Sequence, residues 1–374
     1  MMVVAGGRST LIKAAALLRA AELAGHRGLL VDTGRRQRAS VLAPFLSDLG
    51  LPEPAYHLGA GHGSHAVQAA AVMDSFEAVL LEADADWLVL PGDTGHTAAC
   101  AVVAARFRDR TATRTARLGA GLRCGDWSMP EELNRIVTDR LADLLLAPCC
   151  GCRTNLEAEG VPADRVALVG NLAMDVLLRQ LPAARELDPA RRHGLARGDY
   201  VLATVHRPAT ICHARHLAAV LAGLDRVRDH MPVLLVMHPA TLDAVHRSGL
   251  HRLLHRLTVL EPVGYREMLG LVDAAAVVLT DSGSLQEETT ALGVPCVTIR
   301  QSTERHLTVS HGTNRLAPWP PTPEGILDSF RDALDDGRRA DPPCPEGWDG
   351  QAGQRAVDAL TGGGLAGRGR VPTA

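Results

Sequence analysis

The segment Ala275–Glu288, with the sequence AAVVLTDSGSLQEE, decides the fold class of this 374-residue chain. Its first part, Ala275–Thr280, is a short apolar run typical of a buried strand. Asp281–Ser284 supplies a turn, and the residues that follow open a helix. Repetition of such a strand–turn–helix unit is the sequence pattern of a parallel sheet covered by helices.

The same alternation extends from this segment through the rest of the chain. We predict further strands and helices, the strands over Met2–Ala5, Gly28–Asp32, Trp87–Leu90, Leu144–Ala147, Val201–Val205, Val233–Met237 and Val294–Ile299, and the helices over Ser9–Ala24, His65–Ala83, His96–Phe107, Pro130–Leu141 and Ala214–Val227. The pattern restarts after Val169–Gly170–Asn171. We therefore expect an α/β protein with two Rossmann-like, doubly wound parallel-sheet domains that face each other across a cleft.

The domain boundaries follow from the same pattern. The predicted segments are an N-terminal domain over 1–170, a C-terminal domain over 171–350, and a short helix (Gln354–Leu360) with a disordered glycine-rich tail over 351–374. The segment Leu181–Asp199 is rich in proline, arginine and glycine, and we expect a linker and the entry to the second domain there.

The composition excludes several classes of protein. Apolar residues make up 46% of the chain and the formal net charge is −3, so no basic surface is expected for nucleic acid or an anionic membrane. No stretch approaches the roughly 18 apolar residues of a membrane span, and the N-terminus lacks the features of a signal peptide. A cytoplasmic location is expected. Lys13 is the only lysine in the chain, and it is there either by chance or for its compact ammonium.

The eight cysteines include one C-x-x-C pair, Cys149 and Cys152. A structural zinc site needs two further ligands at similar spacing, and no second pair is present. The pattern favours reduced loop cysteines after a strand over metal or redox chemistry. We expect no metal and no cofactor.

The turn at Ser282, Gly283 and Ser284 is the clearest candidate binding site. Small residues at the start of a helix allow backbone N–H groups to approach an anion such as a diphosphate. Glu288 or Glu287, one helical turn on, is then placed for ribose hydroxyls. The alternative is a capping box, with Ser284 as the cap and Glu287 three residues later.

Other candidates stand at predicted strand ends. His206 and His238 each follow a strand of the second domain, where ligands bind in such sheets. Asp93 follows a strand of the first domain and is either a base or a helix cap. Glu131 comes directly after Pro130, and acids in the first turn of a helix are also ordinary helix chemistry.

Taken together, these pieces resemble the UDP-N-acetylglucosamine 2-epimerase family over roughly residues 1 to 336. The matching pieces, in order, are Gly6–Gly7–Arg8 with Lys13, Gly92–Asp93–Thr94, Ala120–Gly121–Leu122–Arg123, Met129–Arg135, Thr138–Asp143, Val169–Gly170–Asn171, His206–Arg207, Asp281–Glu288 and Thr303–Glu304–Arg305. The resemblance implies the GT-B architecture and a homodimer. In that family, UDP is eliminated from the sugar and added again after inversion at C2.

The resemblance also implies roles for individual residues. Arg8, His206, Ser282, Gly283, Glu288 and Arg305 would hold the nucleotide and diphosphate. From their positions at the helix start and at a strand end, Ser284 and His238 are also expected to bind the nucleotide. Lys13, Asp93, Glu131 and His206 would surround the sugar or act as acids and bases. The nucleotide-sugar is then a substrate, not a cofactor.

The chain departs from the family pattern on the sugar side. The motif that carries a catalytic glutamate in the family reads Arg117–Leu118–Gly119–Ala120–Gly121–Leu122–Arg123, with Gly119 at the glutamate position. Four further positions or segments also differ from the residues usual in the family, namely Ser9–Thr10, Pro208–Ala209–Thr210, Ser284 and His306–Leu307. Loss of a general base costs a factor of roughly 10²–10⁴ in rate.

Three functions are compatible with this pattern. We place first a glycosyltransferase of specialised metabolism that moves a sugar from a nucleotide-sugar to a small-molecule acceptor, because leaving-group stabilisation does not require the missing base. The alternative is a UDP-N-acetylglucosamine 2-epimerase, hydrolysing or non-hydrolysing, in which Asp93 or Glu131 has taken over the lost role. The third is a non-catalytic nucleotide-sugar binding module.

Overall fold

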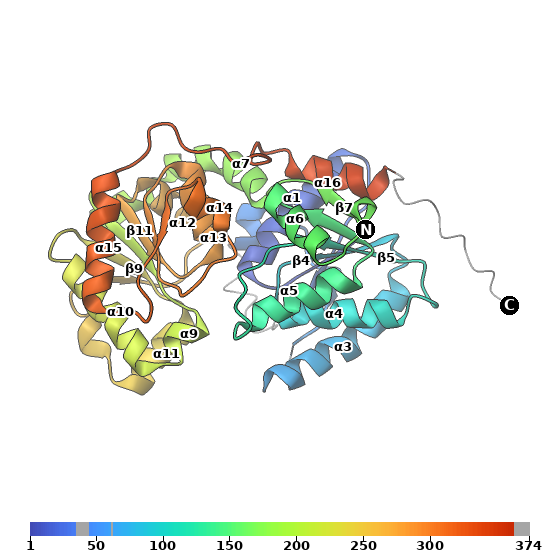
Figure 1. Ribbon diagram of the computed structural model, residues 1–374, viewed down its shortest axis with the longest axis horizontal. Helices are drawn as coiled ribbons and strands as arrows, with labels where there is room; N and C mark the ends of the chain where they lie inside the picture. The colour runs from blue at the N-terminus through green and yellow to red at the C-terminus, as the bar shows by residue number, and fades with distance from the viewer. Residues whose placement is uncertain (35–44, 61–62, 363–374) are drawn as a thin grey trace. The chain divides into compact units, whose positions relative to one another are not determined.

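A computed structural model describes residues 1–34, 45–60 and 63–362 of the chain (Figure 1). The chain divides into two compact units. The first comprises Met1–Val176 together with the chain from Glu346 onward, and the second comprises Leu177–Pro345. The C-terminal helix α16 (Ala352–Thr361) is part of the first unit, where it packs on α1 (Arg8–Leu23).

The first unit is built on one parallel sheet. Within the described residues it has seven strands, in the order β3 (Tyr56–His57), β2 (Leu29–Asp32), β1 (Met2–Ala5), β4 (Trp87–Pro91), β5 (Arg114–Leu118), β6 (Leu144–Ala147) and β7 (Val166–Leu168). Further helices of this unit are α3 (His65–Glu82), α4 (Gly95–Arg106), α5 (Pro130–Leu141) and α6 (Cys150–Ala158), with a 3₁₀ turn at Ala163–Arg165, and residues 45–49 are helical as well. The strand order reverses between β1 and β4, so the switch point of the sheet lies there.

The second unit repeats this architecture. Its described strands form a six-stranded parallel sheet in the order β10 (Thr258–Leu260), β9 (Val233–Val236), β8 (Val201–Thr204), β11 (Val277–Thr280), β12 (Cys296–Thr298) and β13 (Asn314–Leu316). Its helices are α8 (Pro189–Arg192), α9 (Pro208–Ile211), α10 (Ala214–Val227), α11 (Pro239–Ser248), α12 (Tyr265–Ala274), α13 (Gly283–Leu292), α14 (His306–Ser310) and α15 (Pro323–Asp336), with a 3₁₀ turn at His251–Leu254. The helix α7 (Leu172–Leu187) runs through the boundary between the units. The switch point of this sheet lies between β8 and β11.

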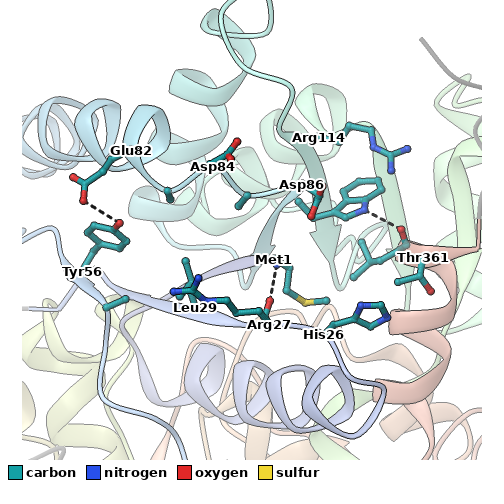
Figure 2. A pocket seen from close by; sticks show the side chains of 15 residues that line it. Met1, His26, Arg27, Leu29, Tyr56, Glu82, Asp84, Asp86, Arg114 and Thr361 are labelled. Atoms are coloured by element: carbon teal, nitrogen blue, oxygen red, sulfur yellow. Dashed lines mark hydrogen bonds between the residues drawn. The ribbon is translucent and has the colours of Figure 1, made fainter. Parts of the chain in front are cut away.

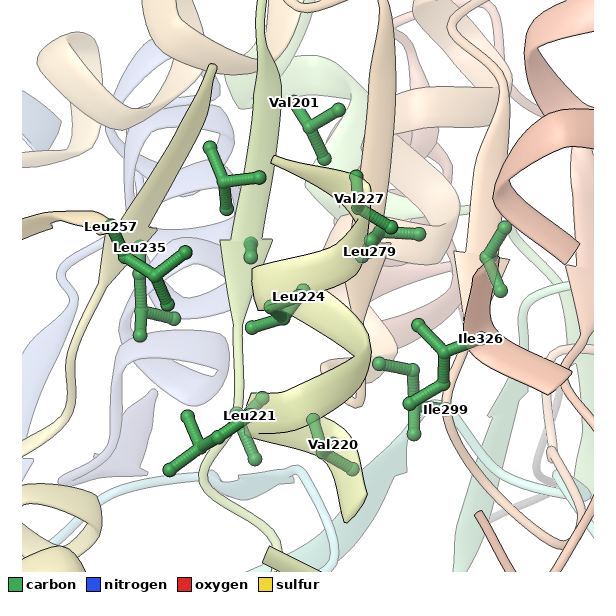
Figure 3. Packing of buried hydrophobic residues seen from close by; sticks show 14 of the residues in the cluster. Val201, Val220, Leu221, Leu224, Val227, Leu235, Leu257, Leu279, Ile299 and Ile326 are labelled. Atoms are coloured by element: carbon green, nitrogen blue, oxygen red, sulfur yellow. The ribbon is translucent and has the colours of Figure 1, made fainter. Parts of the chain in front are cut away.

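Helix α10 shows why these segments fold as they do. Its apolar residues recur every three or four positions, and Leu217, Val220, Leu221, Leu224 and Val227 are all fully buried. This stripe packs between the sheet and α15, as Figure 3 shows for the cluster that includes Ile326. One face of a helix with a period of 3.6 residues therefore supplies much of the core of the second unit.

The prediction of two doubly wound parallel sheets with interleaved helices is confirmed. The short strands β3, β7, β10 and β13 were not predicted, because two or three residues carry no readable period. The prediction of a linker over Leu181–Asp199 is wrong for the residues up to Arg192, which are largely helical, whereas the residues that follow lead without regular structure into β8. Helix α7 continues to Leu187 with Pro182 inside it, and α8 follows directly.

A tertiary interaction explains this helical segment. The buried carboxylate of Asp273 accepts hydrogen bonds from Arg185 and Arg197 at 3.0 and 2.7 Å, which holds both sides of the segment against α12. The predicted C-terminal helix is present as α16, and the predicted tail beyond Gly362 lies outside the described residues. Among the helices that the structure describes, none is long and apolar enough to cross a membrane.

Candidate functional site

The switch point of the second sheet brings together two residues that are 75 positions apart in the sequence. Thr204 of β8 pairs in register with Thr280 of β11. The chain therefore leaves both strands at the same level of the sheet, and His206 Nδ1 lies 2.9 Å from Asp281 Oδ1. The backbone N–H groups of His206 and Arg207 each donate to the same carboxylate at 2.8 Å. Asp281 thus holds the two residues that follow β8 in place at the carboxyl ends of the strands.

Asp281 controls the charge of His206. The carboxylate is fully buried, whereas 38% of the His206 side chain is exposed. The negative charge of Asp281 raises the pKa of His206, against the opposing effect of burial. Burial opposes ionisation of Asp281, but His206 and the two backbone donors outweigh it, and the pKa of Asp281 lies below its usual value. Because Nδ1 faces Asp281, Nε2 is the ring nitrogen that does not pair with this carboxylate.

His238 lies at the end of the neighbouring strand, β9, and its ring centroid is 6.0 Å from that of His206. Its backbone caps α11, and its Nδ1 accepts a hydrogen bond from the Ala240 N–H at 3.2 Å. The structure therefore brings the two histidines together at one edge of the sheet. For His238 the side chain also serves as a helix cap.

The N-terminus of α13 lies directly after Asp281. Helix α13 begins at Gly283, and Ser282 is its N-cap without a side-chain capping hydrogen bond. Ser284 is inside the first turn, so the alternative of a capping box with Ser284 as cap is wrong. A β-carbon at Gly283 would lie 3.0 Å from Glu304 Oε1, which leaves little room for a side chain. The half-buried Ser282–Ser284 turn thus presents backbone amides of the kind that bind phosphate.

The two acidic residues of α13, Glu287 and Glu288, are buried, although a carboxylate that binds ribose hydroxyls would need to be accessible. Glu288 is 3% exposed, and burial raises its pKa to about 8, with a further contribution from the charge of Glu287. Glu287 forms an ion pair with Arg305 at 3.2 Å, and Arg305 also lies 3.7 Å from Glu304. The cation expected to face a diphosphate is therefore held between two carboxylates in this structure.

In the first unit, Lys13 and Gly119 lie side by side. Gly119 follows β5 with a φ of +83°, a conformation that favours glycine. A β-carbon at this position would lie 3.5 Å from Lys13 Nζ. Thr10 of the same helix faces Gly92 after β4, where a β-carbon would lie 2.3 Å from the Thr10 methyl group. The only lysine of the chain therefore lies against the position at which the family resemblance expects a catalytic glutamate.

Asp93 is held by a buried cation. Arg135 Nη1 donates to Asp93 Oδ2 at 2.5 Å, and Arg135 Nη2 pairs with Glu132 Oε2 at 2.6 Å. The helix that follows, α4, is capped by Thr94 and not by Asp93, so the cap alternative for Asp93 is wrong. Glu131 lies half-buried in the first turn of α5, next to Glu132.

Arg8 opens α1 after β1. Its guanidinium lies over the Phe45 ring, 5.4 Å from the centroid, and burial lowers its pKa. The structure thus places Arg8, Lys13 and Asp93 on the segments that follow β1 and β4, the two strands at the first switch point.

Two residues of the candidate site were not predicted from the sequence. Asp281 belongs to the motif after β11, and an acidic residue directly after a buried strand is itself a signal. Arg135 has no such signal. An arginine in a helix is usually expected to be exposed to solvent, whereas Arg135 is only 1% exposed.

A separate pocket lies at the opposite end of the first sheet (Figure 2). Its lining includes Arg27, Tyr56, Trp87 and Arg114, which stand at or before the amino ends of strands. Trp87 Nε1 donates to the carbonyl of Leu360 at 2.9 Å. Since ligands of doubly wound sheets bind at the carboxyl ends, this pocket is not part of the candidate site. Across the described residues, no group of three or more His, Cys, Asp or Glu side chains is arranged to hold a metal ion.

Two Rossmann-like sheets in one chain, each with polar residues at its switch point, define the GT-B class of folds. The chain belongs to the UDP-N-acetylglucosamine 2-epimerase family, whose family model matches residues 22–361.

Individual relatives agree with this assignment. The chain is 31% identical to UDP-N-acetylglucosamine 2-epimerase of Methanocaldococcus jannaschii over 369 residues, covering 96% of this chain and 98% of that protein. It is 33% identical to UDP-2,3-diacetamido-2,3-dideoxy-D-glucuronate 2-epimerase of Pseudomonas aeruginosa, covering 84% of this chain and 87% of that protein. The crystal structure of the M. jannaschii enzyme in complex with UDP-GlcNAc and UDP superposes with a TM-score of 0.88 at 32% identity, over 97% of this chain and 99% of that one.

Proposed function

We propose that this protein is a UDP-sugar 2-epimerase that inverts C2 of a UDP-2-acetamido sugar such as UDP-N-acetylglucosamine. The observation that carries the proposal is the His206–Asp281 pair beside the uncapped N-terminus of α13. A protonated imidazole and a set of helix amides provide positive potential for a diphosphate leaving group. Both the M. jannaschii and the P. aeruginosa relatives are named as 2-epimerases of UDP-sugars.

In the proposed reaction, the C2 proton is removed and the bond between C1 and the diphosphate oxygen breaks, which releases UDP and leaves a C1–C2 double bond. UDP then adds back to C1, and C2 receives a proton on the opposite face. His206 and the Ser282–Ser284 turn stabilise the diphosphate. The raised pKa of His206 keeps the imidazole protonated over more of the neutral range.

Residues of the first unit carry out the proton transfers at C2. Gly119 has no acid or base, so we assign this work to Asp93 and Glu131. Arg135 fixes the position of Asp93, with its Nη1 2.5 Å from Asp93 Oδ2. Lys13, beside Gly119, provides a cation that stabilises negative charge developing on the substrate.

Glycosyl transfer, the first expectation from the sequence, is the second candidate. It is favoured by one observation, the glycine at position 119, since transfer from C1 needs no base at C2. The relatives support epimerisation better, because those that share about a third of the sequence are named as epimerases.

The experiment is mass spectrometry of UDP-N-acetylglucosamine incubated with the protein in D₂O, with and without small-molecule acceptors. Uptake of one deuterium at C2 is the expected result. UDP-2,3-diacetamido-2,3-dideoxy-D-glucuronate is tested in parallel as the second substrate. Release of UDP only when acceptors are present, without deuterium in the nucleotide-sugar, contradicts the proposal and supports transfer. Release of UDP with free sugar in the absence of acceptors identifies a hydrolysing epimerase.

Two variants make this test specific. His206→Ala removes the imidazole that faces the diphosphate and is expected to lower the exchange rate by roughly 10²-fold. His246→Ala is the matched control, because His246 is exposed on α11 of the same unit. Equal loss in both variants speaks against a role of His206 in the reaction.

A further inference from the structure

The N-terminal end of α6 brings two thiols together. Cys149 is the N-cap of this helix, without a side-chain capping hydrogen bond, and Cys152 lies in its first turn. The two sulfur atoms are 3.3 Å apart. The N-cap side chain and the third residue of any helix face each other, which is the geometry that a capping box uses. The expectation of loop cysteines is therefore wrong for Cys152, which is helical and 3% exposed.

We propose that Cys149 and Cys152 form a reversible disulfide, and that this pair is a redox-modification site whose oxidant is a low-molecular-weight disulfide. The Cys149 thiolate attacks one sulfur of the oxidant, whose S–S bond breaks and releases one thiol. The Cys152 thiolate then attacks the Cys149 sulfur and releases the second thiol. Two electrons and two protons pass from the cysteines to the oxidant, which leaves as two thiols.

Exposure sets the order of these steps. Cys149 is half-buried and accessible to a small oxidant, whereas Cys152 is buried and lies 3.3 Å from the Cys149 sulfur. The partial positive charge of a helix N-terminus favours a thiolate at the N-cap position. Cys149 is thus the attacking residue, and Cys152 is the resolving residue. Cys150 is exposed and lies one residue beyond the cap.

The dithiol is mechanically linked to the loop Gly119–Arg123. A β-carbon at Gly121 would lie 2.2 Å from the carbonyl oxygen of Cys152, so the two backbones are in direct contact. Asn155 Nδ2 of α6 donates to the Gly121 carbonyl at 2.9 Å. Arg123 Nε donates to Glu159, the C-cap of α6, at 2.7 Å. Since the loop rests on α6 along its length, a cross-link at the start of this helix restricts both.

The first test measures the bond itself. The full-length protein is treated with oxidised glutathione, denatured, alkylated and examined by mass spectrometry. We expect two thiols fewer than in the reduced protein, mapped to Cys149 and Cys152, and recovery of both with dithiothreitol. Cys152→Ser is expected to trap a glutathione adduct on Cys149. Cys150→Ser and Cys212→Ser are the matched controls and should behave like the unmodified protein.

The second test measures the link to the loop. Oxidation is expected to slow amide hydrogen exchange in 119–123 and 150–158 by on the order of tenfold, because the cross-link limits local opening. Continued alkylation of both Cys149 and Cys152 after oxidation, or a bond to Cys150, overturns the proposed site. A disulfide without slower exchange in 119–123 overturns the link. Neither readout depends on the proposed catalytic activity.

Discussion

His206 and Asp281 form a hydrogen-bonded ion pair between the ends of the two strands at the switch point of the second sheet, with Nδ1 and Oδ1 2.9 Å apart. The geometry is over-determined, because the same carboxylate also accepts the backbone N–H groups of His206 and Arg207. Asp281 therefore fixes the position of the ring and favours its protonated form.

Asp281→Asn is expected to lower the pKa of His206, because the charge that raises it is removed. The pKa is measured by NMR titration of the His206 ring signals. The exchange rate at C2 should fall by roughly 10²-fold near neutral pH, where more of the imidazole becomes neutral. An unchanged His206 titration in this variant contradicts the electrostatic role of Asp281.

The same pair gives a pH dependence of stability. The raised pKa of His206 contributes stability that is complete below its ordinary value of 6.5 and is lost as the pH rises through the folded value. The lowered pKa of Asp281 contributes stability above 3.8 that is lost as the pH falls through its folded value. The destabilisation by Asp281→Asn should therefore be largest between these limits, as measured by urea unfolding from pH 3 to 9 (roughly the span of both titrations).

Glu288→Gln is expected to stabilise the protein at alkaline pH. The pKa of Glu288 is raised from 4.5 to about 8, so its unfavourable effect grows as the pH rises between these values. In the unmodified protein the free energy of unfolding should fall over this window, and the glutamine should remove about 2–5 kcal/mol of that fall. Chemical unfolding at several pH values is the measurement. If the free energy of unfolding of the variant falls over the same pH window, another group causes the pH dependence.

Arg135→Met is expected to destabilise the first unit by about 3–5 kcal/mol, because Glu132 is left buried without its partner. The matched control is Arg226→Met. Arg226 pairs with Glu324 at 2.6 Å, but both side chains are well exposed, so the expected loss is below about 1 kcal/mol. Thermal unfolding of the two variants provides the comparison. Similar losses in the two variants would mean that burial does not increase the contribution of the Arg135–Glu132 pair to stability.

Gly119→Ala is expected to lower the free energy of unfolding by about 1–2 kcal/mol, since a side chain is disfavoured at a φ of +83°. Gly119→Glu carries the same backbone strain, but its carboxylate can reach Lys13, which lies 3.5 Å from the β-carbon position. The glutamate variant should therefore be less destabilised than the alanine variant at low salt. Lys13→Met in the glutamate background should abolish that difference.

Much of the fold was predictable from local sequence. Helix α5 begins and ends at the predicted residues, because Pro130 marks its start and its buried positions recur with the helical period. The central strands β1, β4, β8 and β11 are buried at every position and appear in the sequence as continuous apolar runs. Short edge strands such as β3, with two residues, were not predictable because their pairing depends on a neighbour.

The candidate site was predictable only as a list of residues. Strand ends and small-residue turns are visible in the sequence, which is why His206, His238 and Ser282–Ser284 were identified. Their partners were not visible. Glu304 reaches the start of α13, and Arg135 reaches Asp93, only because the fold brings separate segments into contact.

The sequence by itself determined the class of fold, the order of its elements and the family, because hydrophobic period and ordered motifs are properties of neighbouring residues. Only the tertiary structure decided the charge state and environment of the functional groups. The pKa of His206 depends on Asp281, 75 positions away, and that of Glu288 depends on its complete burial within the second unit. Both are consequences of packing, since desolvation and short-range electrostatics arise only where the fold excludes water.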